Sequence, residues 1–170
     1  MSFDGLQVAA FESRRAEELA RLIAKHGGVP FVSPSLQEVA EEDNRPSIDL
    51  ANRIMTGQID AFVFMTGVGV HYLMRAVERH VDRQRFLNSL EDMTTIARGP
   101  KAVAALREYG INPTLQVPLP NTWREVLDIL DSQLPLNQVN IAVQEYGMPN
   151  PSLVAGLEAR GARVCTVKVY

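Results

Sequence analysis

Three glycine-containing turns follow short apolar runs in the sequence, and each has the composition of an anion-binding turn. They are Thr66-Gly67-Val68-Gly69, Arg98-Gly99-Pro100-Lys101 and Tyr146-Gly147-Met148. A strand that ends at such a turn and continues as a helix presents free backbone N–H groups and the positive end of the helix. Carboxylates and phosphates bind at such a place without many basic side chains. The three turns are therefore candidate anion-binding sites.

A nucleotide is poorly supported as the ligand of the first turn. In a G-x-G-x-x-G loop that starts at Gly67 and Gly69, the third glycine position is Tyr72, so the close helix packing of that loop is missing. The sequence contains no G-x-x-x-x-G-K-[ST] pattern. Two interpretations remain: the glycines only turn the chain tightly, or several turns together bind a ligand with several carboxylates. Arg98 and Lys101 are the basic side chains of these turns, with a solvated role and a ligand role both open.

Other residues with reactive side chains show no pattern typical of a site. The histidines His26, His71 and His80 have no metal-ligand spacing, and Cys165 is the single cysteine, so we expect no metal. Cys165 lies within a strand pattern and is expected to be a small buried residue and not a nucleophile. No serine has the G-x-S-x-G context of a hydrolase.

The composition of the chain argues against several classes of protein. The 170 residues include 17 basic and 20 acidic side chains, for a net charge of -3, so the basic surplus typical of a nucleic-acid binder is missing. No apolar run is long enough for a membrane span, and the N-terminus does not resemble a signal peptide. A single cysteine fits a reducing compartment. We therefore expect a soluble cytoplasmic protein with no nucleic-acid partner and no membrane partner.

Strand and helix patterns alternate along the chain. Apolar runs predict strands at residues 6–11, 29–32, 60–65, 93–97, 114–117, 138–143 and 163–170. Helical spacing predicts a helix after Ser13 and further helices at 46–56, 68–79, 101–109, 123–132 and 152–160. This alternation is typical of an α/β fold with a doubly wound, flavodoxin-like parallel sheet. The three turns would then share the carboxyl edge of the sheet, where ligands usually bind.

Local signals predict where several helices begin. Ser13 is expected to be an N-cap, because Glu17 and Glu18 lie in the first turns of the helical pattern that follows it. Thr122 is expected to cap the helix at 123–132. Pro46 suits a first helical turn. The acidic stretch at 37–45 is expected to be a loop or a crossing between domains.

The order of these motifs resembles the uroporphyrinogen-III synthase family along the whole chain. The resemblance is carried, in order, by IDAFVFMTGVGVHYLMRAVE, TTIARGPKAVAALREYGI, NTWREVLDIL and VNIAVQEYGMPNPSLVAGLEARGARVCTVKVY, and by the earlier Gly27-Gly28-Val29-Pro30. It implies cyclisation of the linear tetrapyrrole hydroxymethylbilane to uroporphyrinogen III, with inversion of the last ring. It also implies that no metal or organic cofactor is needed, and that the ligand is a polycarboxylate, in agreement with the turns.

The resemblance also implies roles for individual residues. A family tyrosine thought to assist loss of the substrate hydroxyl matches Tyr170, although Tyr170 could equally be an ordinary strand residue. The three turns, Thr66 to Gly69, Arg98 to Lys101 and Tyr146 to Met148, would bind the substrate. Members often carry a threonine three places after the glycine of the second turn, and here that residue is Ala102. Catalysis would then rest mainly on positioning.

The implied architecture has two similar α/β domains with the active site between them. Residues 1–34 would be the N-terminal β-α-β of an incomplete first domain, and residues 35–170 would be the second domain with connector strands at its ends. We therefore expect this apparently shortened chain to be inactive alone, and residues 1–34 to be mobile, rearranged or paired with another chain through open strand edges. The alternative is a non-catalytic ligand-binding or regulatory module with the same fold.

Overall fold

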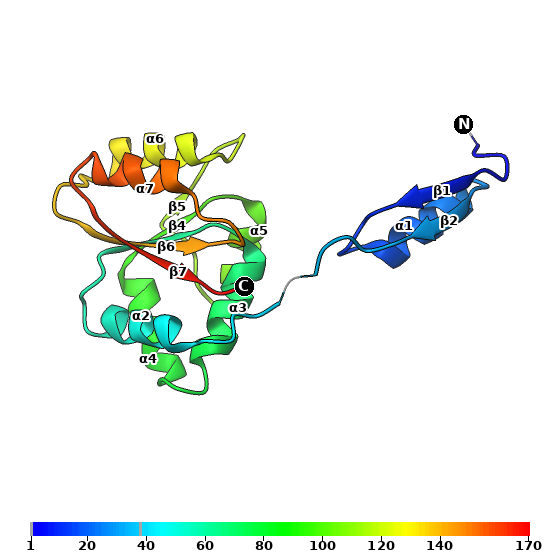
Figure 1. The fold of residues 1–170 in the computed structure, drawn as a ribbon. Helices are drawn as coiled ribbons and strands as arrows, with labels where there is room; N and C mark the ends of the chain where they lie inside the picture. The colour runs from blue at the N-terminus through cyan, green and yellow to red at the C-terminus, as the bar shows by residue number, and fades with distance from the viewer. Residues whose placement is uncertain (1, 38) are drawn as a thin grey trace. The chain divides into compact units, whose positions relative to one another are not determined.

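The chain forms two compact units, Met1–Val39 and Ala40–Tyr170, in a computed structural model that describes residues 2–37 and 39–170. The division follows residue 39, whereas the sequence led us to expect it after residue 34. Each unit has its own parallel sheet, and the two are described separately below (Figure 1).

The first unit is a single β-α-β motif. Its elements are β1 (Gln7–Ala10), α1 (Ala16–Lys25) and β2 (Val29–Val32). The two strands pair in parallel, with Gln7 opposite Val29 and Ala10 opposite Val32. Gly27 has a φ of +78°, a left-handed conformation that favours glycine and lets the chain leave α1 for β2.

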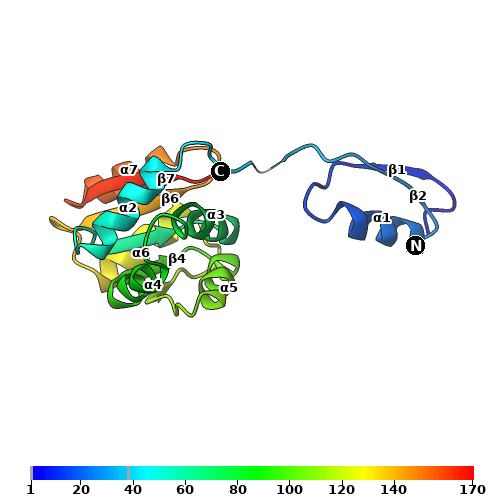
Figure 2. The ribbon, with the colours of Figure 1, turned by 90° about the horizontal axis from the view of Figure 1, so that it is seen from below.

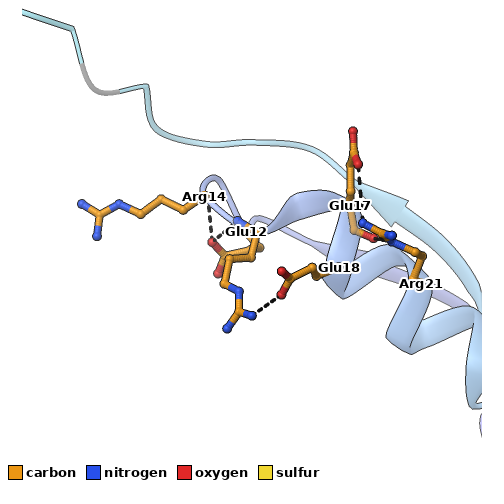
Figure 3. Close-up of polar contacts among 6 residues, drawn as sticks. Glu12, Arg14, Glu17, Glu18 and Arg21 are labelled. Carbon is orange, nitrogen blue, oxygen red and sulfur yellow. Dashed lines mark hydrogen bonds and ion pairs between the residues drawn. The ribbon is translucent and has the colours of Figure 1, made fainter. Parts of the chain in front are cut away.

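The start of α1 differs from the prediction that Ser13 caps it. The N-cap is Arg15, without a side-chain cap bond. The carboxylate of Glu12 instead accepts hydrogen bonds from the backbone N–H groups of Arg14 at 2.8 Å and Arg15 at 3.1 Å (Figure 3). These two bonds hold the pKa of Glu12 below its ordinary value, and the bond from Arg15 has the larger effect. The Ser13 hydroxyl accepts a hydrogen bond from the backbone N–H of Leu36 and joins two loops.

The second unit contains a parallel five-stranded sheet with the strand order β5-β4-β3-β6-β7. Its strands are β3 (Ala61–Phe64), β4 (Thr94–Ala97), β5 (Leu115–Gln116), β6 (Asn140–Glu145) and β7 (Arg163–Lys168). Counted from β3, the order is 3-2-1-4-5, which reverses direction between β3 and β6 and defines a doubly wound sheet. The predicted α/β class is therefore confirmed.

Helices cover both faces of this sheet (Figures 1 and 2). One face packs against α2 (Arg45–Met55), α3 (Gly67–Val77), α4 (Arg83–Asp92) and α5 (Pro100–Glu108). The other packs against α6 (Trp123–Gln133) and α7 (Pro151–Glu158). Every residue of the central strand β3 is buried, as expected for a strand with helices on both sides.

The helix starts of the second unit agree with the sequence signals, with one helix that we had not predicted. Pro46 lies in the first turn of α2, and Thr122 caps α6 in a capping box with Glu125. The bonds from the Thr122 hydroxyl and backbone N–H hold the pKa of Glu125 below its ordinary value. The unpredicted helix is α4, which is capped by the Asp82 side chain.

Candidate active site at the carboxyl edge of the sheet

The predicted site residues follow four neighbouring strands of the second unit. Thr66 follows β3, Arg98 follows β4, Tyr146 follows β6 and Tyr170 follows β7. Since these strands are parallel and adjacent in the order β4-β3-β6-β7, all four residues lie at the same edge of the sheet. This edge is where doubly wound proteins usually bind ligands.

The hydroxyl groups of Thr66 and Tyr170 are in contact at this edge. The Thr66 Oγ1 atom lies 2.9 Å from the phenolic oxygen of Tyr170, in a hydrogen bond for which either group can be the donor. Thr66 is also the N-cap of α3, and its Oγ1 accepts a hydrogen bond from the backbone N–H of Gly69 at 3.0 Å. Because β6 lies between β3 and β7, the Thr66–Tyr170 bond spans the end of β6.

The ring of Tyr170 is held against α3. It stacks on the ring of Tyr72, with ring centroids 5.4 Å apart and an angle of 21° between the planes. Both rings are half-buried against the core on the α3 side of the sheet. Tyr72 occupies the position at which a nucleotide loop would have its third glycine, so the departure from that pattern supplies the stacking partner.

Gly67 and Gly69 allow close packing at the start of α3. Neither belongs to the glycines with positive φ, so neither is needed for a left-handed turn. A Cβ atom at Gly67 would overlap the backbone carbonyl oxygen of Lys101, and one at Gly69 would overlap the side-chain amide of Gln144. The interpretation that these glycines only turn the chain is therefore wrong, since they let α5 and β6 approach α3.

Arg98 and Tyr146 join the second and third turns. The guanidinium carbon of Arg98 lies 4.8 Å from the centre of the Tyr146 ring, in a cation–π contact, and both side chains are half-buried. The backbone N–H of Arg98 donates to the carbonyl of Phe64 and fixes the end of β4 against β3. Such stacking orients a guanidinium while its N–H donors can still bind a carboxylate.

The third turn is tight and places Met148 outward. The backbone N–H of Met148 donates to the carbonyl of Tyr146 at 2.6 Å, and Gly147 between them has a φ of +62°. This is a γ-turn with its central residue in a conformation that favours glycine. The Met148 side chain is 78% exposed, and Met148 lines a small pocket together with Met65, Tyr146 and Asn150.

The second turn borders a groove. Gly99 is the extended N-cap of α5, Pro100 is in the first turn, and the side chain of Lys101 is exposed. Beside them lies a groove of about 450 Å³, whose lining includes Gly99, Pro100, Arg107, Leu119 and Asn121. The N-terminus of α5 and one basic side chain therefore face an open space large enough for a side chain of a ligand.

Comparison with a family model and comparison with solved structures both identify the family of this chain. Residues 17–170 match the family model described as uroporphyrinogen-III synthase HemD. The chain belongs to the uroporphyrinogen-III synthase family. The predicted family membership is thus confirmed.

Solved structures of uroporphyrinogen III synthase from the extremely thermophilic bacterium Thermus thermophilus agree with this family. A mutant form is 31% identical, with a TM-score of 0.76, over 96% of this chain and 61% of that one. A wild-type form is 30% identical, with a TM-score of 0.67, over 98% of this chain and 61% of that one. A Bacillus subtilis (strain 168) relative, named uncharacterized protein YjjA, is 29% identical over 98% of this chain and 60% of its own length. The chain thus spans about three-fifths of the length of these relatives.

Within this synthase fold, one buried polar residue at the edge had not been predicted. Gln144 belongs to β6 and is 0% exposed. The predicted strand ended at residue 143, which excluded it. The available signal was the continuous apolar run Ile141-Ala142-Val143, which is typical of a strand covered on both faces, so that the next side chain of a longer strand is also buried.

Other reactive groups do not gather at the edge. Cys165 is half-buried in β7, and burial raises the pKa of its thiol, which disfavours the nucleophilic thiolate at neutral pH. Among the described residues, no group of three or more His, Cys, Asp and Glu side chains is arranged to hold a metal ion. None of the helices described is long and apolar enough to cross a membrane.

Proposed function

We propose that this chain contributes the carboxyl edge of its five-stranded sheet to a cytoplasmic synthase that cyclises hydroxymethylbilane to uroporphyrinogen III with inversion of the last ring. The observation that carries the proposal is the hydrogen-bonded pair of Thr66 and Tyr170 at 2.9 Å, beside the N-terminus of α3. The family membership of the chain supports the same reaction. The resemblance seen in the sequence pointed to Tyr170, and the structure supplies a partner that orients its phenol.

Substrate carboxylates would bind to the turns at the edge. The helices α3 and α5 both begin there, and the first N–H groups of a helix have no acceptor within the helix. Thr66, Gly67, Val68 and Gly69 would form one binding turn, and Gly99 with Lys101 a second one. Arg98, stacked on Tyr146, adds a fixed positive charge between the second and third turns.

Tyr170 would act on the hydroxyl that the substrate loses. Its phenol donates a hydrogen bond to the leaving oxygen as the carbon–oxygen bond breaks. The oxygen gains a proton and leaves as water, while the neighbouring pyrrole nitrogen loses a proton, so that an azafulvene remains. Ring closure through a spiro intermediate then needs only a fixed arrangement of the rings, which the several carboxylate contacts would supply.

We further propose that these 170 residues bind a polycarboxylate tetrapyrrole but do not turn over hydroxymethylbilane alone. The matched synthases are longer, and about two-fifths of each lies outside the alignment with this chain. A substrate with carboxylates around its whole periphery needs contacts on more than one side. The carboxyl edge of the sheet would supply the contacts on one side.

The first unit has an open apolar surface that would fit a second copy of the chain. Alternate residues of β1 and β2 differ in exposure, because α1 covers only one face of the two-stranded sheet. On the uncovered face Phe31 is 71% exposed, and Phe11 just after β1 is also 71% exposed. Both edges of this sheet also present unpaired backbone groups. We propose self-association through these open strand edges, with the apolar face beside them in the contact.

The reaction is tested by the isomer composition of the product. Fresh hydroxymethylbilane is incubated with the 170-residue chain, and with the chain extended past Tyr170 by the corresponding segment of the Thermus synthase. The porphyrins are then oxidised and separated. We expect isomer I alone from the 170-residue chain and an excess of isomer III from the extended chain. In the extended chain, Tyr170→Phe should lower the rate of isomer III formation by about 10²-fold.

A second candidate function is a binding module without turnover. Ala102, where many family members carry a threonine, is 1% exposed in α5, so the chain has no hydroxyl at that place. Isomer I alone from a folded extended chain that still binds uroporphyrin would contradict the synthase and favour this module. An excess of isomer III would exclude it.

A further inference from the structure

Gln144 is a fully buried amide without a hydrogen-bond partner. Its side chain is 0% exposed, and within the described structure neither Nε2 nor Oε1 has an acceptor or donor. Buried side-chain amides are normally hydrogen-bonded, because an unsatisfied polar group in the interior destabilises the fold. A methionine of similar size would avoid that cost. Packing alone therefore does not account for a glutamine here.

The amide of Gln144 points toward the start of α3. Gln144 lies opposite Val167 of β7, and its strand neighbour Ala142 packs in the core on the α3 side. Side chains two residues apart in a strand share a face, so Gln144 points to the same side. Its amide lies against Gly69, the third residue of α3, in the space that a Cβ atom there would fill.

The first turn of α3 therefore combines three sets of donors. The backbone N–H groups of Gly67 and Val68 are at positions with no acceptor within the helix. The N–H of Gly69 is bonded to the Thr66 hydroxyl. The Nε2 of Gln144 adds a side-chain donor beneath this turn. Donors of this kind, next to a positive helix end, match a carboxylate.

We propose that Gln144 is a further substrate-binding residue, whose Nε2 donates to a substrate carboxylate seated at the first turn of α3. The inference rests on the proposed function, because that function supplies the polycarboxylate. The Thr66–Tyr170 hydrogen bond spans the end of β6 in the ligand-free chain. A carboxylate seated beside this bond gives Gln144 its missing acceptor.

The test compares Gln144→Met with the wild-type chain, using uroporphyrin III, a stable octacarboxylate, as the probe. We expect Gln144→Met to weaken binding about tenfold or more, since one hydrogen bond to a charged group is lost. The same variant should melt at a higher temperature than the wild type, because an unsatisfied amide is removed. The matched control is Gln58→Met, at an exposed position before β3, which should leave both quantities unchanged.

Side-chain amide NMR separates ligand binding from a structural role. The signals of the Gln144 NH₂ group, assigned by their loss in Gln144→Met, should shift and exchange more slowly with water when the probe is added. Equal affinities for wild type and Gln144→Met would overturn the inference and leave the proposed function standing. Unmoved Gln144 signals at probe saturation would overturn it as well. No binding of the probe by the wild type would contradict both.

Discussion

The Thr66 hydroxyl and the Tyr170 phenol form a hydrogen bond of 2.9 Å between residues 104 positions apart in the chain. Thr66 follows β3 and is the N-cap of α3, whereas Tyr170 follows β7. The bond therefore connects the strands on either side of β6. One hydroxyl group caps a helix and also orients the phenol that we propose to act on the substrate.

Replacing Thr66 by valine should lower the free energy of unfolding by about 1–2 kcal/mol, because the variant loses the cap of α3. Tyr170→Phe removes the other half of the hydrogen bond but leaves the cap, and should cost about 1 kcal/mol or less. Urea unfolding measures both. The control is Thr166→Val, at an exposed position of β7, which should change stability by less than about 0.5 kcal/mol. Equal stability of Thr66→Val and wild type would show that the cap contributes nothing.

Gly67→Ala should destabilise the chain by about 1–3 kcal/mol, since the added Cβ would overlap the backbone carbonyl of Lys101. Alanine normally stabilises a helix relative to glycine, so the expected sign is the opposite of the helix preference. Gly99→Ala is the control: its Cβ would be 3.6 Å from the nearest Asn121 atom, an ordinary contact. Thermal unfolding should show the larger loss for Gly67→Ala, and a stabilised Gly67→Ala would contradict the close packing of α3 on α5.

The capping box of α6 should make the stability of the folded chain depend on pH. The Thr122 hydroxyl and N–H lower the pKa of Glu125 in the folded chain below its ordinary value of 4.5. The unfolded chain therefore binds the proton more readily, and the stabilisation by Glu125 is complete above pH 4.5 and is lost as the pH falls through the lowered pKa. Glu125→Gln should thus have a lower melting temperature than the wild type at pH 7, and the difference between them should be smaller at pH 3.

A double-mutant cycle with Thr122→Val isolates this interaction. In the Thr122→Val background, Glu125→Gln should have a smaller effect at pH 7 than in the wild type. An effect of the same size in both backgrounds would show that Glu125 acts through some other contact.

Phe31→Ser should weaken self-association of the chain. Phe31 is 71% exposed on the face of the first unit that α1 leaves uncovered. Sedimentation velocity at several concentrations should show a concentration-dependent dimer for the wild type and a monomer for Phe31→Ser. Leu36→Ser is the control, because Leu36 is 78% exposed but lies outside both strands. A wild-type chain that stays monomeric at every concentration would contradict the proposal.

The sequence predicted those features that depend on neighbouring residues. The apolar run of β3, the Thr122 cap and the Pro46 helix start all follow from local preferences, and all are present. The alternation of strands and helices then predicts the parallel sheet and its common edge. The expected Ser13 cap is wrong because the Glu12 carboxylate, one residue earlier, accepts from the backbone N–H groups of Arg14 and Arg15, while the Ser13 hydroxyl accepts from that of Leu36.

The remaining features depend on contacts between distant parts of the chain. The bond from Thr66 to Tyr170 follows from the pairing of β3, β6 and β7, which no local pattern encodes. The burial of Gln144 depends on the approach of Gly69, from a different element. The helix α4 was missed although its buried residues Phe86, Leu87 and Leu90 have helical spacing, since they lie among many charged residues.

The most direct measurement is an amide NMR titration of the ¹⁵N-labelled chain with uroporphyrin III. If the edge binds a polycarboxylate tetrapyrrole, the backbone amides of Gly67, Val68, Lys101 and Gly147 should shift in a saturable way, together with that of Tyr170. Amides at the opposite end of the strands, such as that of Asp60, should not move. Saturable shifts confined to residues away from this edge, or no shifts at all, would contradict the central claim that these turns bind the substrate.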